Sequence, residues 1–188
     1  MGYAGGTKKN PTYHNLGDHT ETIEVDYDPT LISYEQLLEV FWRSHDPTQR
    51  SWSRQYMAAV FYHNEDQKRR ALETRERVQE KFATPLSTQI LPATEFYAAE
   101  AYHQKYRLRQ APDLMDEFTR IYPNNEDFVN STAAARVNGF LYGYGSAEDV
   151  DAAADRLGLS TNATKKLRDL VKNRHSGSRF LELLRPRL

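Results

Sequence analysis

Residues 19–42 read HTETIEVDYDPTLISYEQLLEVFW, and the pattern of this stretch changes halfway along it. Residues 19–28 alternate well enough to predict a half-buried strand, which Pro29 ends. Residues 33–36 read SYEQ, the form of a capping box, and the apolar residues that follow predict a helix over 34–44. A strand followed by an amphipathic helix is typical of a fold that layers helices on a sheet.

The same order of elements continues along the chain. We predict a buried strand over 55–63, a charged helix over 65–82, a short strand over 87–91 and an aromatic-rich helix over 96–107. Before residue 19, the segment GYAGG at residues 2–6 predicts only a glycine turn. The fold class predicted is α+β: an α/β two-layer sandwich with a ferredoxin-like mixed sheet.

The composition of the sequence changes after residue 110, and no strand pattern occurs beyond that point. Glycines and prolines separate five predicted helices, over 112–121, 125–139, 147–157, 161–174 and 178–184. The sequence therefore predicts two domains: residues 1–109 as the α+β domain and residues 110–188 as an all-helical C-terminal extension.

Composition excludes several classes of protein. Of the 188 residues, 39% are hydrophobic and 27% are charged, which is a globular composition. The net charge of −1 gives no reason to expect a nucleic-acid partner. No run of about 18 apolar residues is present, so we expect no membrane partner. Residues 161–188 are basic, which we interpret as a solvated helical face. The start of the chain shows no secretory signal, so the cytoplasm is the default compartment; a longer N-terminus could carry a mitochondrial or other targeting signal.

The chain has no cysteine, which excludes disulfides, thiolate metal sites and thiol nucleophiles within these residues. The six histidines show no metal-binding spacing, so we predict neither a metal site nor a bound cofactor. No phosphate-binding glycine loop and no G-x-S-x-G segment occurs.

Several polar groups lie on otherwise apolar or aromatic stretches. They are Tyr13, Glu21, Tyr27, His45, Asp46, Tyr56, Glu100, Tyr102 and His103. The alternation places Glu21 on the side of Ile23 and Val25, where a carboxylate is costly unless it has partners or a task. A buried carboxyl group stays protonated more readily and can serve as a general acid, with tyrosine hydroxyls around a small polar ligand. Each of these residues also has an ordinary structural role, as core, helix stop or exposed side chain.

Six segments occur in an order that resembles one family. They are GYAGG at 2–6, NPTY at 10–13, HTETIEVDYDP at 19–29, ISYEQLLEVFWRSHDPTQ at 32–49, RQYMAAVFY at 54–62 and FYAAEAYHQKY at 96–106. Together they resemble the peptide-methionine (S)-S-oxide reductases, the methionine sulfoxide reductase A family. The resemblance covers residues 2–106.

The resemblance implies an oxidoreductase that repairs oxidative damage by reducing methionine-S-sulfoxide, free or in proteins. A cysteine attacks the sulfoxide sulfur and becomes a sulfenic acid, which other thiols and thioredoxin then restore. By the same resemblance Glu21 is the general acid, and Tyr13 and Tyr56 hold the sulfoxide oxygen.

Two features depart from the family pattern. The cysteine segment, which in the family precedes the glycines, is not in this chain, so we expect the chain to be inactive alone. The loop before Tyr56 is shortened to RSWSR and has no Asp; Trp52 is a candidate for an aromatic wall there.

Three functions are compatible with this sequence. The chain can be an N-terminally truncated form of a reductase. It can be a non-catalytic protein that binds methionine sulfoxide in the retained pocket. It can also be an interaction protein that acts through its helical extension.

Overall fold

The structure is a computed structural model that describes the backbone of residues 1–183 and the side chains of residues 1–173. Internal contacts divide the chain into two compact units, one that ends at Glu100 and one that begins at Ala101. Each unit is described by itself. The domain boundary predicted after residue 109 stays a prediction.

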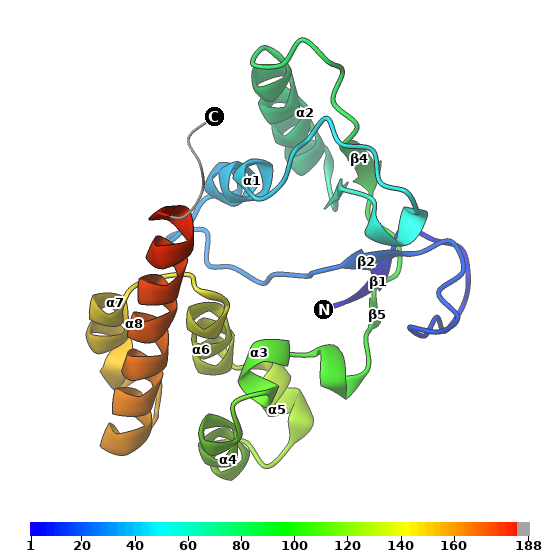
Figure 1. Cartoon of the computed structure of the whole chain (residues 1–188). Coiled ribbons are helices and arrows are strands. Elements are labelled where there is room, and N and C mark those ends of the chain that lie inside the picture. The colour runs from blue at the N-terminus through cyan, green and yellow to red at the C-terminus, as the bar shows by residue number, and fades with distance from the viewer. Residues whose placement is uncertain (184–188) are drawn as a thin grey trace. The chain divides into compact units, whose positions relative to one another are not determined.

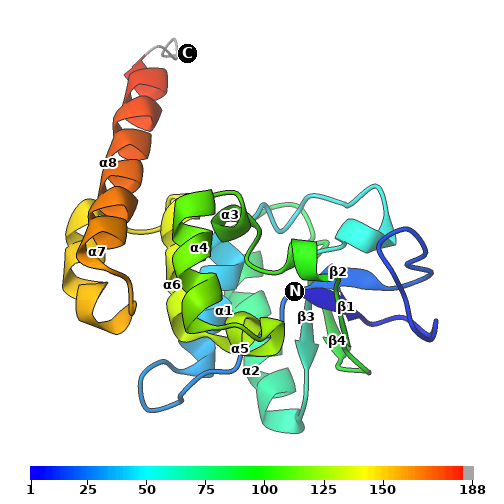
Figure 2. The same ribbon diagram turned by 90° about the horizontal axis from the view of Figure 1, so that it is seen from below.

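The strands of the first unit form two small sheets. In the first, β1 (Gly2–Ala4) lies between β2 (Thr20–Thr22) and β5 (Tyr97–Ala98) and is antiparallel to both. In the second, β3 (Ala59–Tyr62) and β4 (Gln89–Pro92) pair in parallel (Figures 1 and 2). The α+β class is confirmed, and the strands are shared between an antiparallel and a parallel sheet.

The glycine segment at the start is the central strand β1, so the prediction of a turn without a strand was wrong. A Cβ on Gly2 would lie 2.4 Å from the carbonyl oxygen of Tyr97, and glycine therefore lets β1 and β5 approach closely. Gly5 has a φ of 77°, a left-handed conformation that glycine adopts without strain, and the chain leaves the strand there.

Helix α1 (Tyr34–Arg43) begins at the predicted capping box. The Gln36 N–H donates to Ser33 Oγ at 3.2 Å, and the Ser33 N–H donates to Gln36 Oε1 at 2.8 Å. The helix buries Leu38 and Trp42 against the next helix. Both hydrogen bonds of the capping box are present, so the predicted start of this helix is confirmed.

Helix α2 (Glu65–Gln79) is shorter than predicted. Its buried residues are Ala71 and Thr74, whereas Leu72 and, beyond the end of the helix, Phe82 are exposed. The indole N–H of Trp42 donates to Thr74 Oγ1 at 3.0 Å. Small side chains on α2 thus make room for the large indole of α1, a pairing that periodicity within one helix does not reveal.

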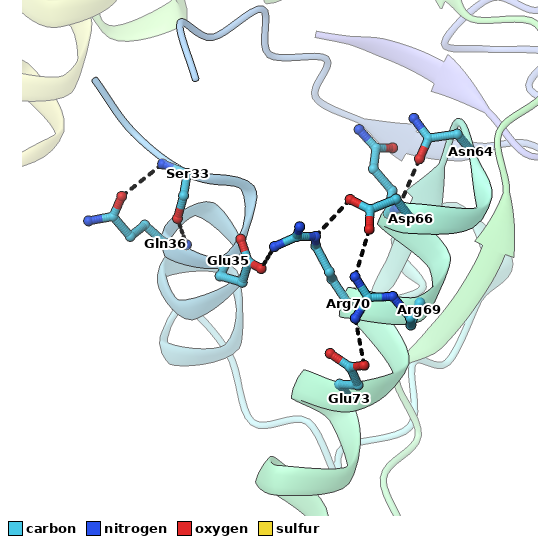
Figure 3. Close-up of polar contacts among 9 residues, drawn as sticks. Ser33, Glu35, Gln36, Asn64, Asp66, Arg69, Arg70 and Glu73 are labelled. Atoms are coloured by element: carbon cyan, nitrogen blue, oxygen red, sulfur yellow. Dashed lines mark hydrogen bonds and ion pairs between the residues drawn. The ribbon is translucent and has the colours of Figure 1, made fainter. Parts of the chain in front are cut away.

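An ion-pair network joins α1 and α2 (Figure 3). Arg70 of α2 contacts Glu35 of α1 and also Asp66 of its own helix. Arg69 lies between Asp66 and Glu73, at 2.7 and 2.8 Å. Exposed pairs of this kind contribute about 0–1 kcal/mol each, so the buried contacts of Trp42 dominate the packing of these helices.

Two strand predictions were too long. The strand predicted over 19–28 is β2 alone, and Ile23 and Val25 beyond it are exposed, because no strand pairs with that segment among the described residues. The strand predicted over 55–63 begins as the 3₁₀ turn η1 (Arg54–Tyr56) and becomes extended only at β3. The strand predicted over 87–91 is β4.

The aromatic helix predicted over 96–107 was also wrong. Its start is strand β5, which pairs with β1. From Ala101 on, the segment belongs to the second unit and forms the 3₁₀ turn η2 (Ala101–His103) and the short helix α3 (Tyr106–Arg109). Lys105, with a φ of 52°, separates these two elements. Aromatic residues suit both strands and helices, so composition did not distinguish them.

The described part of the second unit is helical, which confirms the predicted helical C-terminal region (Figure 2). Beyond η2 and α3 its elements are α4 (Pro112–Ile121), α5 (Asn125–Asn130), α6 (Thr132–Tyr142), α7 (Ala147–Ala153), η3 (Ala154–Arg156) and α8 (Thr161–Leu183). Helix α4 has its predicted bounds. Its Leu114 and Phe118 are buried with Phe128 and Leu167 in one core.

Four helix predictions in this unit need correction. The helix predicted over 125–139 is broken at Ser131, whose hydroxyl accepts from the Ala134 N–H and begins α6. The helix predicted over 147–157 ends as α7 followed by η3. The last two predicted helices are one continuous α8 as far as Leu183, and residue 184 lies outside the described residues. Of the helices described, none is long and apolar enough for a membrane span.

Candidate active site

The three site residues predicted by resemblance lie close together in the first unit. Glu21 is the middle residue of strand β2, and Tyr56 is the last residue of the turn η1. Tyr13 lies in the loop between β1 and β2, next to a bridge between Thr12 and Asn15. Contacts between η1 and β2 thus bring together residues that lie more than thirty positions apart in the sequence.

Gln55 connects two of these residues. Its side-chain amide donates to Glu21 Oε1 at 2.6 Å and to the Tyr56 hydroxyl oxygen at 3.2 Å. Glu21 is half-buried. One amide therefore fixes the distance between the predicted acid and one of the predicted oxygen-binding hydroxyls.

Tyr13 reaches the same cluster through Tyr56. Loss of hydration raises the pKa of Tyr56, and a hydrogen bond with the Tyr13 side chain and the nearby charge of Glu21 raise it further. Tyr56 consequently stays protonated and able to donate well above neutral pH. The structure brings Glu21, Tyr13 and Tyr56 together, and their chemical roles stay predictions.

Glu100 holds the loop that carries Tyr13. Its Oε1 accepts from the backbone N–H of Tyr13 at 3.0 Å, and its Oε2 accepts from the hydroxyl of Tyr3 at 2.7 Å. Tyr3 is 1% exposed and belongs to the central strand β1. The Tyr13 backbone is thereby tied to the core of the sheet.

Arg54 attaches the turn η1 to the same loop. Its Nε donates to the Asp18 carbonyl at 2.6 Å, and its Nη2 donates to the Gly5 carbonyl at 2.8 Å. Its own carbonyl accepts from Thr20 Oγ1 at 3.0 Å. Two carbonyl groups of the loop and one side-chain hydroxyl of β2 therefore set where Gln55 and Tyr56 lie.

Buried His19 closes the base of the loop. The Gly6 N–H donates to His19 Nδ1 at 3.3 Å, so the ring hydrogen lies on Nε2, which donates to the Lys8 carbonyl at 2.7 Å. Asp18 beside it accepts from the Thr7 and Lys8 backbone N–H groups at 2.8 and 3.2 Å. These contacts fold residues 6–19 back on themselves.

Trp52 stands beside the cluster on the shortened loop. Its side chain is 84% exposed, and its ring centroid lies 5.2 Å from that of Tyr56. An exposed indole next to polar groups offers an apolar face to a ligand. Its role as an aromatic wall stays a prediction.

The other candidate residues have structural contacts. His45 binds the Phe41 carbonyl at 2.9 Å and Thr88 Oγ1 at 3.0 Å, which secures the end of α1 against β4. Asp46 accepts from Thr48, and this lowers the pKa of Asp46. Half-buried Tyr27 lies in the segment after β2. Tyr102 and His103 form η2 of the second unit.

Sequence reasoning missed the roles of Gln55, Arg54 and His19. Glu100 was a candidate only as a polar group in an aromatic stretch. Gln55 and Arg54 directly precede Tyr56, and this adjacency was the one available signal. Their partners lie on β2 and in the loop before it, and sequence spacing does not show such contacts.

Among the residues that the structure describes, no group of three or more His, Asp or Glu side chains is placed to hold a metal ion. A shallow hollow of about 400 Å³ lies elsewhere, between α7 and α8, and is lined by Asp151, Asp155, Lys165 and Arg168 among others. It does not include the residues of the candidate site.

The sequence matches two family descriptions. Residues 1–137 match the model of peptide methionine sulfoxide reductase. Residues 123–172 match that of the helical domain of selenoprotein methionine sulfoxide reductase A. The second match covers α6, α7 and most of the described part of the helical region.

Curated relatives agree with these matches. A peptide methionine sulfoxide reductase of Drosophila melanogaster is 41% identical over 162 residues, which cover 85% of this chain and 65% of that protein. Peptide methionine sulfoxide reductase A5 of Oryza sativa subsp. japonica is 40% identical over 146 residues, covering 74% of this chain and 57% of that protein. The chain thus spans less than two thirds of these relatives.

A solved structure resembles this chain over part of its length. Mxr1 from Saccharomyces cerevisiae in its reduced form is 30% identical and has a TM-score of 0.54, with 59% of this chain and 69% of that chain covered. The motifs, the clustered site and the family match over residues 1–137 agree, and this chain belongs to the peptide methionine sulfoxide reductase family.

Proposed function

We propose that this chain binds methionine-S-sulfoxide, in proteins or free, at the cluster of Glu21, Tyr13 and Tyr56. The observation that carries the proposal is the Gln55 amide, which contacts both Glu21 and Tyr56. It gathers an acid and a hydroxyl donor at one place, next to the exposed indole of Trp52. Polar groups beside an apolar face suit a ligand with one strongly polar oxygen on an apolar thioether chain.

The chemistry of the ligand explains this set of residues. A sulfoxide oxygen carries partial negative charge and accepts hydrogen bonds, which Tyr13 and Tyr56 supply in the proposal. The oxygen leaves sulfur readily only after it has gained a proton, and Glu21 is the proposed donor. Together these groups stabilise the charge that develops on the oxygen as the S–O bond weakens.

The reducing group is proposed to come from outside these 188 residues. The chain has no cysteine, and an acid and two tyrosines cannot take up the oxygen's oxidising equivalents. In the reaction that the family implies, a thiol sulfur takes the oxygen and becomes a sulfenic acid, methionine is released, and thioredoxin or another thiol reductant restores the thiol. We therefore expect the chain to bind the sulfoxide without turnover.

The description of the matching helical domain bears on the identity of that group. It names a selenoprotein reductase, so the proposed reacting group is a thiol or its selenium counterpart. The intact mass and selenium content of the natural protein distinguish these two possibilities. A repair role in the cytoplasm is part of the same proposal.

Titration calorimetry with a peptide that contains methionine-S-sulfoxide tests the binding. We expect saturable binding to the chain, weaker binding of the methionine peptide, and a loss of at least tenfold in affinity for Glu21→Gln. The matched control is Glu24→Gln, on the exposed segment after β2. Equal affinity for the oxidised and reduced peptides would contradict the proposal.

The reaction is tested separately. With dithiothreitol as reductant we expect no methionine from this chain above the rate without protein. Production of methionine by these 188 residues would show that no external thiol or selenol is needed beyond the reductant. If the longest natural form also binds sulfoxide without turnover, the function is that of a non-catalytic binding protein.

A further inference from the structure

The environment of the Gln55 side chain determines the orientation of the hydrogens in the candidate site. Gln55 Nε2 carries two hydrogens and no lone pair for acceptance, so both of its contacts are donations. One goes to Glu21 Oε1 at 2.6 Å and the other to the Tyr56 oxygen at 3.2 Å. Glu21 Oε1 and the Tyr56 oxygen are thereby both acceptors toward Gln55.

This assignment restricts where an acidic proton on Glu21 can lie. In a carboxylic acid the carbonyl oxygen accepts hydrogen bonds better than the hydroxyl oxygen, and Glu21 Oε1 is the oxygen that accepts from the Gln55 amide at 2.6 Å. The proton of the neutral acid therefore lies on Oε2. In the same way the Tyr56 hydroxyl hydrogen points away from Gln55, since the hydroxyl oxygen accepts from the Gln55 amide.

We propose that Gln55 is a positioning residue for methionine sulfoxide binding: it keeps the acidic proton on Glu21 Oε2 and turns the Tyr56 hydroxyl hydrogen toward the ligand oxygen. The inference rests on the proposed function. Gln55 itself does not touch the sulfoxide in this arrangement. Its contribution is to hold two donors in the orientation that one oxygen atom can accept.

The local backbone supports a positioning role. Gln55 lies in η1 between Arg54 and Tyr56, and Arg54 holds this turn through carbonyl groups of Gly5 and Asp18. The amide thus starts from a backbone position that is fixed by three separate contacts, including Thr20 Oγ1 on the Arg54 carbonyl. A side chain anchored in this way can set the orientation of its neighbours.

The first test measures oxygen-specific binding. Gln55→Leu removes both donors, and Gln55→Glu keeps the shape but replaces the donors by acceptors. We expect both variants to lower the affinity for the methionine-S-sulfoxide peptide by about tenfold or more, while weak binding of the methionine peptide is unchanged. The matched control is Gln49→Leu, at an exposed position. Wild-type sulfoxide affinity in Gln55→Glu would overturn the proposal.

The second test needs no ligand and so separates this inference from the proposed function. The side-chain amide signals of Gln55 in nuclear magnetic resonance spectra report on its acceptors. We expect these signals to shift when the carboxylate is removed in Glu21→Leu and to keep their positions in the control Glu24→Leu. Unchanged signals in Glu21→Leu would overturn the positioning role even if the chain binds sulfoxide. A shift without any sulfoxide binding would support the Gln55–Glu21 contact and contradict the proposed function.

Discussion

The hydroxyl of Tyr3 donates to Glu100 Oε2 at 2.7 Å, across 97 positions of the sequence. The other oxygen of the same carboxylate accepts from the Tyr13 backbone N–H. Glu100 thus binds the central strand and the loop of the candidate site at once. The two contacts make its carboxylate a structural part of that site.

Removal of this carboxylate is expected to destabilise the first unit. Glu100→Leu should lower the free energy of unfolding by about 2 kcal/mol, because it removes two hydrogen bonds, one from the hydroxyl of the buried Tyr3 and one from the Tyr13 N–H. Tyr3→Phe should cost about 1 kcal/mol. Urea denaturation of both single variants and of the double variant measures the coupling. Strictly additive effects would contradict a direct contact.

The buried hydrogen bond between α1 and α2 gives a second prediction. Thr74→Val keeps the size of the side chain but removes the acceptor of the Trp42 indole N–H. A buried donor without a partner costs about 1–3 kcal/mol, so we expect a loss of about 2 kcal/mol by urea denaturation. The control Thr84→Val, at an exposed position, should change stability by less than about 0.5 kcal/mol. A larger loss in the control than in Thr74→Val would contradict the importance of this contact.

Acid sensitivity gives a third prediction. The backbone N–H of Thr7, with that of Lys8 and the Thr7 hydroxyl, lowers the pKa of Asp18 from 3.8 to about 2. Because the folded state has the lower pKa, the ionised carboxylate stabilises the fold above pH 3.8 and loses this effect as the pH falls toward about 2.

Asp18→Asn is expected to reduce the dependence of stability on pH. The urea midpoint of the variant should be lower than that of the wild type at neutral pH. The difference between the two midpoints should narrow as the pH falls from 3.8 to about 2. The matched control is Asp26→Asn, on the exposed segment after β2. A difference in urea midpoint between wild type and Asp18→Asn that grows on acidification would contradict this prediction.

Two glycines are expected to respond in opposite ways to substitution by alanine. At Gly5, φ is 77° and a Cβ would lie 2.5 Å from the Phe61 ring, so Gly5→Ala should cost at least about 1–2 kcal/mol. At Gly139, inside α6, a Cβ would meet nothing within 4 Å. Gly139→Ala should therefore stabilise the chain by about 0.5–1 kcal/mol. Thermal denaturation of the two variants tests both signs.

Sequence signals at helix ends predicted where two of the helices begin. The capping box at Ser33 gave the start of α1, and Pro112 gave that of α4, because the first turn of a helix is fixed by neighbouring residues. Strand β1 has no such signal. Its three residues, Gly2–Ala4, stand among glycines, which do not favour a strand. Only pairing with β2 and β5 makes them a strand.

The residues of the candidate site were likewise predictable from the sequence, whereas their contacts were not. Family motifs located Glu21, Tyr13 and Tyr56, and the structure joins Glu21 to Tyr56 through the Gln55 amide, with the Tyr13 side chain next to Tyr56. The expected reason for Glu21 was different: it was placed on a buried apolar strand face. Ile23 is 72% exposed, so that face ends with β2. The neighbours of Glu21 come from η1, whose turn conformation the sequence did not predict.

The contacts of Arg54 have a consequence for variation in the loop between β1 and β2. Both acceptors of its guanidinium are main-chain carbonyls, those of Gly5 and Asp18, and every residue type provides a carbonyl. An exchange of a loop side chain that leaves the backbone in place therefore leaves this attachment intact, which excludes Gly5, whose left-handed conformation needs glycine, and Asp18 and His19, whose side chains fold the loop. At the other loop positions the surface beside Glu21 can change while the turn that carries Gln55 keeps its anchor.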